Sequence, residues 1–402
     1  MRNITTAMRI IYAIFFLCLL SKNAKSQLHQ KEAKKLTAFN FSMLSGGTII
    51  LQAQLDDFSD TLNFVFDTGS GGISLDSSTA AHFNLVSQKS DKFVKGIAGV
   101  KPLFFLNNHT LKLKGLSVAH LDFHINNYDI LSNAYGIKID GVIGSSFLRR
   151  YIIKINYNIN LIEVFEPGYV KYPKRGIVIK PNFNSLPTFN TTITDNVSSN
   201  GEIIFDTGAG LNALLTEDFI VDNNLISPKR KKFTTQAEGL GGKKTMQTTV
   251  VSKIQIGPYK FKLVPVYLFK DEFNVIGYPK NLGVIGNDIL RRFNLIINYP
   301  NQEIHLKPNS HFFDDFDYSY TGLGLYQING QIRIEDVMPN SPAAKAGVMP
   351  DDIVFAVDNN FTQNMQTYKQ ALQSSGNSVK LLIIRNGEPI TIVLQIAHLL
   401  QD

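Results

Sequence analysis

The sequence predicts a mostly-β protein in which two similar lobes are followed by a small α+β domain. Three observations support this fold class. Two motifs recur in the same order, the segments around them resemble short strands, and a helix-and-hairpin pattern follows the second copy. At roughly 100–200 residues per domain, a chain of 402 residues has room for two to four domains. Apolar residues make up 44% and charged residues 18%, which excludes disordered, collagen-like and coiled-coil proteins.

The N-terminal segment has the organisation of a secretory signal. Arg2 and Arg9 precede an apolar run at 10–20, and a small-x-small pattern follows at 24–26. The run is shorter than the roughly 20 residues that a membrane-spanning helix needs, so an uncleaved anchor is the less favoured alternative. We therefore predict that residues 1–26 are a signal peptide of a secreted or periplasmic bacterial protein, which meets the membrane only if the signal is uncleaved.

Much of the basic charge belongs to this segment. The chain has 40 Lys+Arg and 33 Asp+Glu, a net charge of +7. Cleavage after Ser26 leaves 36 basic and 33 acidic residues, a net charge of +3, so no nucleic-acid partner is predicted. The single cysteine, Cys18, leaves with the signal. The mature chain then has no disulfide and no thiolate metal site, and no metal or other cofactor is predicted.

Two motifs define the internal repeat. An apolar strand that ends in Phe leads into Asp-Thr-Gly at 67–69 and again at 206–208. An apolar-apolar-Gly element that runs into Leu-Arg-Arg occurs at 142–150 and again at 284–292. The offsets are 139 and 142 residues, so a duplicated lobe of about 140 residues is predicted. The two lobes are placed at 27–170 and 171–309.

Each lobe begins with a pair of predicted strands. In the first lobe, 48–55 and 61–66 are joined by the polar turn 56–60. The second lobe repeats the pattern at 189–194 and 202–205. The Leu-Arg-Arg segments are predicted as short helices that follow Gly-rich turns and precede an apolar strand.

The region after the second lobe has helix and turn signals of its own. Ser341 as N-cap, Pro342 in the first turn and Gly347 as terminator outline a short helix. Asn386-Gly387 is typical of a type I′ hairpin turn. The predicted boundaries are 310–319 for an acidic, aromatic linker, 320–402 for the domain and 366–375 for its second helix.

The repeated Asp-Thr-Gly carries the predicted chemistry. Two symmetry-related carboxylates, Asp67 and Asp206, can approach to about 3 Å, where like charges cannot both ionise. Such a pair shares one proton, so one aspartate acts as general base while the other acts as general acid. The pair could activate a water and protonate the leaving nitrogen of an amide. The alternative, a polar turn that merely ends a strand, does not explain duplication in register.

The neighbouring loop residues are given supporting roles. The two threonines suit hydroxyls that bond across to the opposite loop, and the two glycines suit a close approach of backbone to a carboxylate. Ser70 has a hydroxyl where Ala209 has none, so we expect Asp67 to be the more acidic aspartate. The supporting residues are Thr68, Gly69, Ser70, Thr207, Gly208 and Ala209.

On these motifs, residues 36–309 resemble the aspartic protease family, which contains pepsins and retroviral proteases. The resemblance implies a bilobal, double β-barrel-like fold with a substrate cleft between the lobes and no metal. It also implies endopeptidase activity on protein or peptide substrates through a water held between Asp67 and Asp206. The short lobes look closer to the retroviral type fused in tandem, and we expect a monomer.

The same resemblance points to flaps over the cleft. The candidate flap in the first lobe is 93–100, with Gly96 and Gly99 as hinges. A tyrosine usual on the pepsin flap is not evident there. The equivalent Gly-rich stretch of the second lobe contains Gly239 and Gly241.

The C-terminal unit, at about 320–398, resembles a PDZ domain. The resemblance lies in Gly322-Leu323-Gly324-Leu325, which matches the carboxylate-binding loop of that family, and in the helix that begins after Ser341. It implies that loop N–H groups capture a peptide C-terminus and that the peptide adds a strand beside the loop.

Two other classes of function are weighed. Ser70 and His82 lie in segments that resemble the serine and histidine motifs of trypsin-like enzymes, but His82 follows Ser70 by only twelve residues, the wrong order and spacing for that fold. A catalytically silent, exported peptide-binding protein on the same scaffold is the second alternative. It would need neither proton-sharing aspartate, so the retained pair favours the protease.

Overall fold

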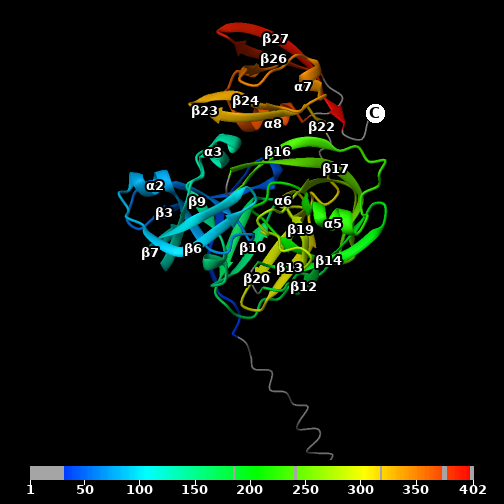
Figure 1. Ribbon diagram of the computed structural model, residues 1–402. Helices are drawn as coiled ribbons and strands as arrows, with labels where there is room; N and C mark the ends of the chain where they lie inside the picture. The colour runs from blue at the N-terminus through cyan, green and yellow to red at the C-terminus, as the bar shows by residue number, and fades with distance from the viewer. Residues whose placement is uncertain (1–30, 184–185, 240–241, 317–318, 374–377, 399–402) are drawn as a thin grey trace, which may run out of the picture.

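The computed structural model describes residues 31–398 apart from 184–185, 240–241, 317–318 and 374–377. The predicted signal peptide therefore lies outside the described residues. The protein is mostly β, with two lobes and a smaller C-terminal domain above them (Figure 1). The predicted fold class is confirmed. Within the described residues, no helix is both long enough and apolar enough to cross a membrane.

The N-terminal lobe is built on an eight-stranded sheet with the order β2-β3-β4-β9-β5-β8-β7-β6. Its strands are β2 (Ser42–Met43), β3 (Ile49–Leu55), β4 (Leu62–Phe66), β5 (Ile73–Asp76), β6 (Gln88–Gly96), β7 (Gly99–Leu113), β8 (Leu116–Asn126) and β9 (Gly141–Ile143). Its helices are η1 (Ser45–Gly47), α2 (Ser77–His82), α3 (Asp129–Tyr135) and α4 (Ser145–Leu148). The two predicted strands correspond to β3 and β4, and the first Leu-Arg-Arg segment begins in α4.

The second lobe has a seven-stranded sheet with the order β13-β14-β19-β15-β18-β17-β16. Its strands are β13 (Thr188–Thr194), β14 (Ser198–Phe205), β15 (Ala213–Thr216), β16 (Phe233–Gly239), β17 (Gly242–Ile256), β18 (Tyr259–Phe269) and β19 (Asn281–Ile285). Its helices are α5 (Glu217–Asp222) and α6 (Asn287–Leu290). From β13 onward this order matches that of the N-terminal lobe from β3 onward, which is the duplication expected from the repeat.

A third sheet joins the lobes. Its order is β1-β11-β10-β20-β21-β12, and β10 pairs with β20 so that Ile153 lies opposite Ile297. Both side chains are fully buried in one apolar core that extends through both lobes. Its strands are β1 (Lys35–Asn40), β10 (Ile152–Asn156), β11 (Leu161–Phe165), β12 (Ile177–Ile179), β20 (Phe293–Asn298) and β21 (Glu303–Pro308).

The C-terminal domain has a five-stranded sheet with the order β23-β24-β25-β26-β27 and a core of its own. Ser341 Oγ accepts the Ala344 N–H at 3.2 Å as the predicted N-cap, and Asn386 and Gly387 both have positive φ, as a type I′ turn requires. Its elements are β22 (Ser319–Tyr320), β23 (Leu323–Ile328), β24 (Gln331–Val337), α7 (Pro342–Lys345), β25 (Ile353–Val357), α8 (Met365–Ala371), β26 (Ser378–Arg385), β27 (Glu388–Gln395) and β28 (Ala397–His398).

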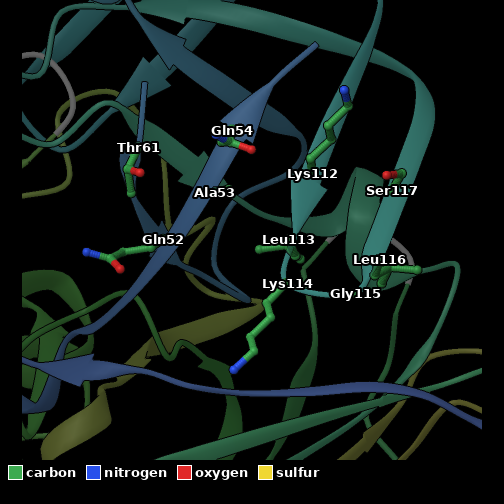
Figure 2. Close-up of a pocket in the computed structure, with 10 residues that line it drawn as sticks. All are labelled: Gln52, Ala53, Gln54, Thr61, Lys112, Leu113, Lys114, Gly115, Leu116 and Ser117. Carbon is green, nitrogen blue, oxygen red and sulfur yellow. The ribbon is translucent and has the colours of Figure 1, made fainter. Parts of the chain in front are cut away.

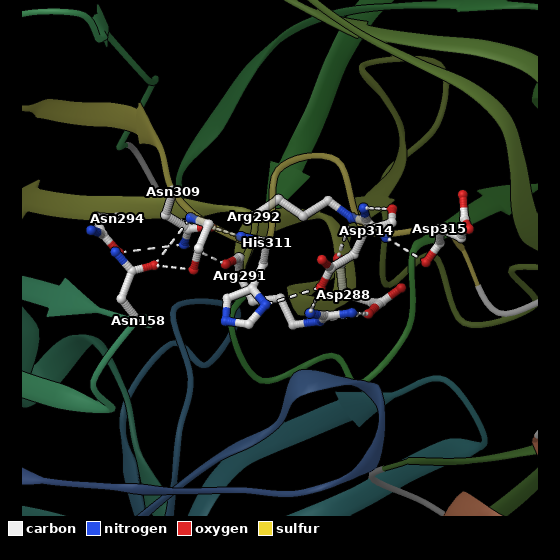
Figure 3. Close-up of polar contacts among 10 residues, drawn as sticks. Asn158, Asp288, Arg291, Arg292, Asn294, Asn309, His311, Asp314 and Asp315 are labelled. Atoms are coloured by element: carbon white, nitrogen blue, oxygen red, sulfur yellow. Dashed lines mark hydrogen bonds and ion pairs between the residues drawn. The ribbon is translucent and has the colours of Figure 1, made fainter.

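The segment that leads to this domain is folded against the second lobe (Figure 3). Arg292 is 1% exposed, and its guanidinium lies 4.0 Å from the centre of the Phe316 ring. The same guanidinium donates to the main-chain oxygens of Asp314 and Asp288. The first half of the predicted linker is therefore fixed to the lobe by a buried cation.

Candidate active site

The two predicted catalytic aspartates follow equivalent strands of the two lobes. Asp67 follows β4 and its N–H donates to the Ile143 oxygen at 3.0 Å, whereas Asp206 follows β14 and its N–H donates to the Ile285 oxygen at 3.1 Å. In each lobe the strand before the aspartate runs parallel to the apolar-apolar-Gly strand. This pairing explains why the two motifs recur together, since each pair of strands fixes the start of one candidate catalytic loop.

The threonines of the two loops bond to each other across the lobe boundary. Thr68 Oγ1 donates to the Phe205 oxygen at 2.7 Å and accepts the Thr207 N–H at 3.0 Å. Thr207 Oγ1 donates to the Phe66 oxygen at 3.1 Å and accepts the Thr68 N–H at 3.1 Å. Both threonines are fully buried. Four reciprocal hydrogen bonds therefore fix one loop against the other, in the role expected for these hydroxyls.

The glycines allow the two carboxyl groups to meet. A Cβ at Gly69 would lie 2.3 Å from Asp206 Oδ2, and a Cβ at Gly208 would lie 2.3 Å from Asp67 Cγ. Each glycine therefore faces the carboxyl group of the opposite lobe at a distance that no side chain allows. The two carboxyl groups therefore lie close together, and each acts on the pKa of the other.

Main-chain N–H groups complete the surroundings of the pair. Gly69 donates to Asp67 Oδ1 at 2.6 Å, and Gly208 donates to Asp206 Oδ1 at 2.7 Å. Ala209 also donates to Asp206 Oδ1, at 3.1 Å. Ser70 reaches Asp67 through its main-chain N–H. The side-chain difference between Ser70 and Ala209 therefore provides no basis for the expected difference in acidity.

Both aspartates have raised pKa values. Burial is the largest cause for each, and the charge of Asp206 raises the pKa of Asp67 further, well above 3.8. The N–H donors act in the opposite direction on both groups. A carboxyl pair in this environment retains one proton at pH values where exposed aspartates are ionised, so it can accept and donate a proton at the same time.

Two residues that the sequence analysis did not assign donate hydrogen bonds to main-chain oxygens of the two Asp-Thr-Gly loops. Ser145, the first residue of α4, donates its N–H to the Ser70 oxygen at 3.0 Å. Asn287, the first residue of α6, donates its N–H to the Ala209 oxygen at 2.8 Å. Both follow the glycine of the second repeated motif, so the repeat itself contained the signal that they support the site.

Comparisons with known proteins agree with this geometry. The aspartyl protease family model matches the chain at residues 51–147 and 191–289. The two matched stretches lie one in each lobe, so both lobes are similar to that family. The PDZ domain model matches residues 333–386, which confirms the assignment of the C-terminal domain.

One curated relative shares a short stretch with the chain. Over 72 residues it is 32% identical to the probable periplasmic serine endoprotease DegP-like of Hahella chejuensis (strain KCTC 2396). The match covers 17% of this chain and 15% of that protein, so the chain spans only a small part of its relative. In the N-terminal lobe, His82 is largely exposed and lies 3.4 Å from Asp60, and no hydrogen bond joins Ser70 to a histidine in the described part of the chain.

The hairpins that carry the candidate flaps contact each other through Ile97 and Gly239. Gly96 ends β6 and Gly99 begins β7, with Ile97 in the turn between them. A Cβ at Gly239, the last residue of β16, would lie 2.6 Å from Ile97 Cγ1. Ile97 also packs against an apolar cluster of the second lobe, and Ala209 packs against the same cluster. Gly241 lies outside the described residues.

The candidate carboxylate-binding loop of the PDZ domain begins with a glycine that the backbone requires. Gly322 has φ +80°, and a Cβ there would lie 2.2 Å from Ser341 Cβ. Leu323 and Gly324 begin β23 and pair with β24, whereas Leu325 is buried in the core of the domain. The Leu325 side chain therefore anchors the loop in the core of the domain.

An open hollow on the N-terminal lobe lies between β3 and the β7–β8 hairpin (Figure 2). Its lining is mainly polar, and Lys112 in it is paired with Asp57 at 2.6 Å. None of the catalytic-loop residues lines it. The ten lining residues are Gln52, Ala53, Gln54, Thr61, Lys112, Leu113, Lys114, Gly115, Leu116 and Ser117.

Proposed function

We propose that this protein is an aspartic endopeptidase that hydrolyses peptide bonds with a water activated between Asp67 and Asp206. The observation that carries the proposal is the close pair of carboxyl groups, each facing the glycine of the opposite loop, whose raised pKa values favour a shared proton. The reciprocal threonine bonds support it, since they hold the two carboxyl groups in one fixed arrangement.

The reaction would proceed in two proton-transfer steps. The ionised carboxylate accepts a proton from the water as its oxygen attacks the scissile carbonyl carbon, while the protonated carboxyl donates to the carbonyl oxygen. A tetrahedral diol results. Return of one diol proton to a carboxylate and donation of the other carboxyl proton to the amide nitrogen then break the C–N bond. The pair ends with one proton, as it began.

A serine mechanism is the competing class, because the curated relative is named a serine endoprotease. The two classes are separated by Ser70→Ala, which copies the residue of the second lobe at Ala209. We expect Ser70→Ala to retain cleavage within about threefold, because it removes no group that contacts the scissile bond. A loss comparable to that of an aspartate variant would favour the serine class.

The decisive experiment uses casein as an unfolded substrate between about pH 3 and pH 8. We expect Asp67→Asn and Asp206→Asn each to lower kcat by at least about 10³-fold, and a statine-type inhibitor to block the wild type. If the wild type cleaves nothing, or if the asparagine variants cleave equally well, the protein is a silent peptide-binding protein or uses other groups.

We also propose that the protein is exported and acts as a monomer on protein or peptide substrates, with the PDZ domain binding peptide C-termini. Export is supported by the signal-like pattern of residues 1–26 and by the periplasmic description of the curated relative. N-terminal sequencing of the mature protein is expected to begin at Gln27. If the N-terminal sequence began at Met1 instead, the signal would be uncleaved, and the chain would be anchored or not exported.

A further inference from the structure

The peptide-binding side of the PDZ domain faces the N-terminal lobe. In PDZ domains a peptide adds a strand to an exposed sheet edge, next to the carboxylate-binding loop. Here the strand that follows this loop is β23, which is an edge strand paired only with β24 among the described strands. Helix α8 packs beside it. Figure 1 shows β23 and α8 on the side of the domain nearest α3 and β16, with β26 and β27 on the far side.

The C-terminal end of α3 is bound by two side chains of α8. Gln366 Nε2 donates to the Tyr135 oxygen at 2.8 Å, and Lys369 Nζ donates to the Ala134 oxygen at 2.6 Å. Gln366 Oε1 also accepts the Ser45 N–H at 2.9 Å. The last carbonyl groups of a helix have no partner within it, and a cation there is favourable. The PDZ domain therefore supplies the C-terminal cap of a helix in the catalytic part.

Gly136, which ends α3, lies between β23 and α8. A Cβ at this residue would lie 2.5 Å from Met365 Cβ of α8 and 3.0 Å from Gln327 Oε1 of β23. Its φ of +71° also favours glycine. The chain therefore contacts both the edge strand and the helix, on the side of the PDZ domain where a bound peptide would lie.

The same domain contacts the second candidate flap. Lys243, next to the tip of the β16–β17 hairpin, pairs with Glu335 of β24 at 3.1 Å. Its ammonium also lies 4.2 Å from the centre of the Tyr326 ring of β23. Helix α3 packs on β16 of the same hairpin. The PDZ domain thus holds the flap directly through Lys243 and indirectly through α3.

We propose that the PDZ groove is occupied by the C-terminal end of α3 and that a peptide with a free C-terminus has to displace it, which releases the second flap. The displacement of α3 does not depend on the proposed protease function. The effect on cleavage rests on the proposed protease function. In this arrangement a peptide ligand of the PDZ domain increases access to the two aspartates.

The test compares the double variant Gln366→Ala/Lys369→Ala with Gln370→Ala in the full mature chain. Gln370 is exposed on the same helix and is a matched control. Amide hydrogen exchange is measured on peptides covering 129–136 and 233–256. Loss of three cross-domain hydrogen bonds, one from a cation, is expected to raise exchange in both regions about tenfold over the control. Unchanged exchange in either region would overturn the proposal.

Two further measurements test the ligand and the activity. A fluorescein-labelled pool of random heptapeptides with free C-termini is expected to bind the double variant about tenfold more tightly than the control, and the amidated pool should bind neither. Equal binding to variant and control would contradict an occupied groove. Cleavage of casein should rise about threefold in the double variant. If no form cleaves casein, the proposed function fails while exchange and binding still decide the occupancy. If exchange rises and the cleavage rate does not, the regulatory effect is excluded.

Discussion

At the scale of single residues, the catalytic-loop glycines leave no tolerance for a side chain. A Cβ at Gly208 would lie 2.3 Å from Asp67 Cγ, so Gly208→Ala forces the two carboxyl groups apart. We expect this variant to fold and to lose at least about 10²-fold in kcat, because proton transfer by the pair depends on the close approach of the two carboxyl groups. The rate of casein cleavage measures this effect. Gly71→Ala is the control, since a Cβ there meets no atom within 4 Å.

The raised pKa of Asp67 predicts how stability depends on pH. The folded chain binds this proton more tightly than the unfolded chain, in which the pKa is near 3.8. The free energy of unfolding therefore falls as the pH rises from 3.8 to the raised pKa of Asp67, and the full decrease is present above that pKa. Asp67→Asn removes the ionisable group, so we expect its gain in Tm to be larger at pH 7 than at pH 3.5.

The control for this measurement is Asp57→Asn. Lys112 lowers the pKa of this exposed carboxylate, so its contribution has the opposite sign and is lost at low pH. It should produce no gain in Tm at pH 7. If Asp67→Asn gave the same shift at both pH values, the pair would not have a raised pKa in the folded protein.

At the scale of elements, the buried Arg292 connects α6 to the segment before the PDZ domain. Arg292→Met keeps most of the side-chain volume but leaves the oxygens of Asp314 and Asp288 without this donor. We expect the free energy of unfolding to fall by about 3 kcal/mol. Urea denaturation measures the change, with the exposed Arg175→Met as control. A change below about 0.5 kcal/mol would mean that the connector is held by its other contacts.

The same arginine shows where sequence reasoning stops. A short helix was expected at each Leu-Arg-Arg segment, and one is found there, although each helix ends at the leucine and the arginines form the turn after it. Their second arginines are nevertheless used differently. Arg150 lies on the surface and bonds the main-chain oxygens of Ala119 and His120, whereas Arg292 is buried beneath the connector. Nothing in the repeated residues distinguishes the two, since the difference comes from segments far away in the chain.

The candidate site likewise has some features that could be predicted from the sequence and others that could not. The Asp-Thr-Gly loops were predictable because duplication required two equivalent carboxylates to meet. The packing of Gly136 between Met365 and Gln327 was not, because Met365 lies more than two hundred residues further along the chain and an ordinary glycine follows α3. The hydrogen bond expected from the Ser70 hydroxyl was also not predictable in this form, because main-chain N–H groups of both loops donate to the carboxyl groups instead.

At the scale of the whole molecule, the two halves of the site are held by one chain. If the proposed monomer is correct, the rate of casein cleavage per molecule is expected to stay constant on dilution from about 10 μM to about 1 nM, because the local concentration of one lobe near the other is fixed by the covalent link. Analytical ultracentrifugation over the same range gives the oligomeric state. A rate that falls on dilution would show that a second copy contributes to the site.

The pairing of β10 with β20 has a consequence for stoichiometry. An enzyme assembled from two identical lobes would have to present two copies of every attached domain and treat both sides of its cleft alike. Here the joined lobes share one C-terminal domain, which contacts α3 of one lobe and the flap hairpin of the other. The two lobes therefore need not be equivalent, because the one domain contacts a helix in the first lobe and a hairpin in the second.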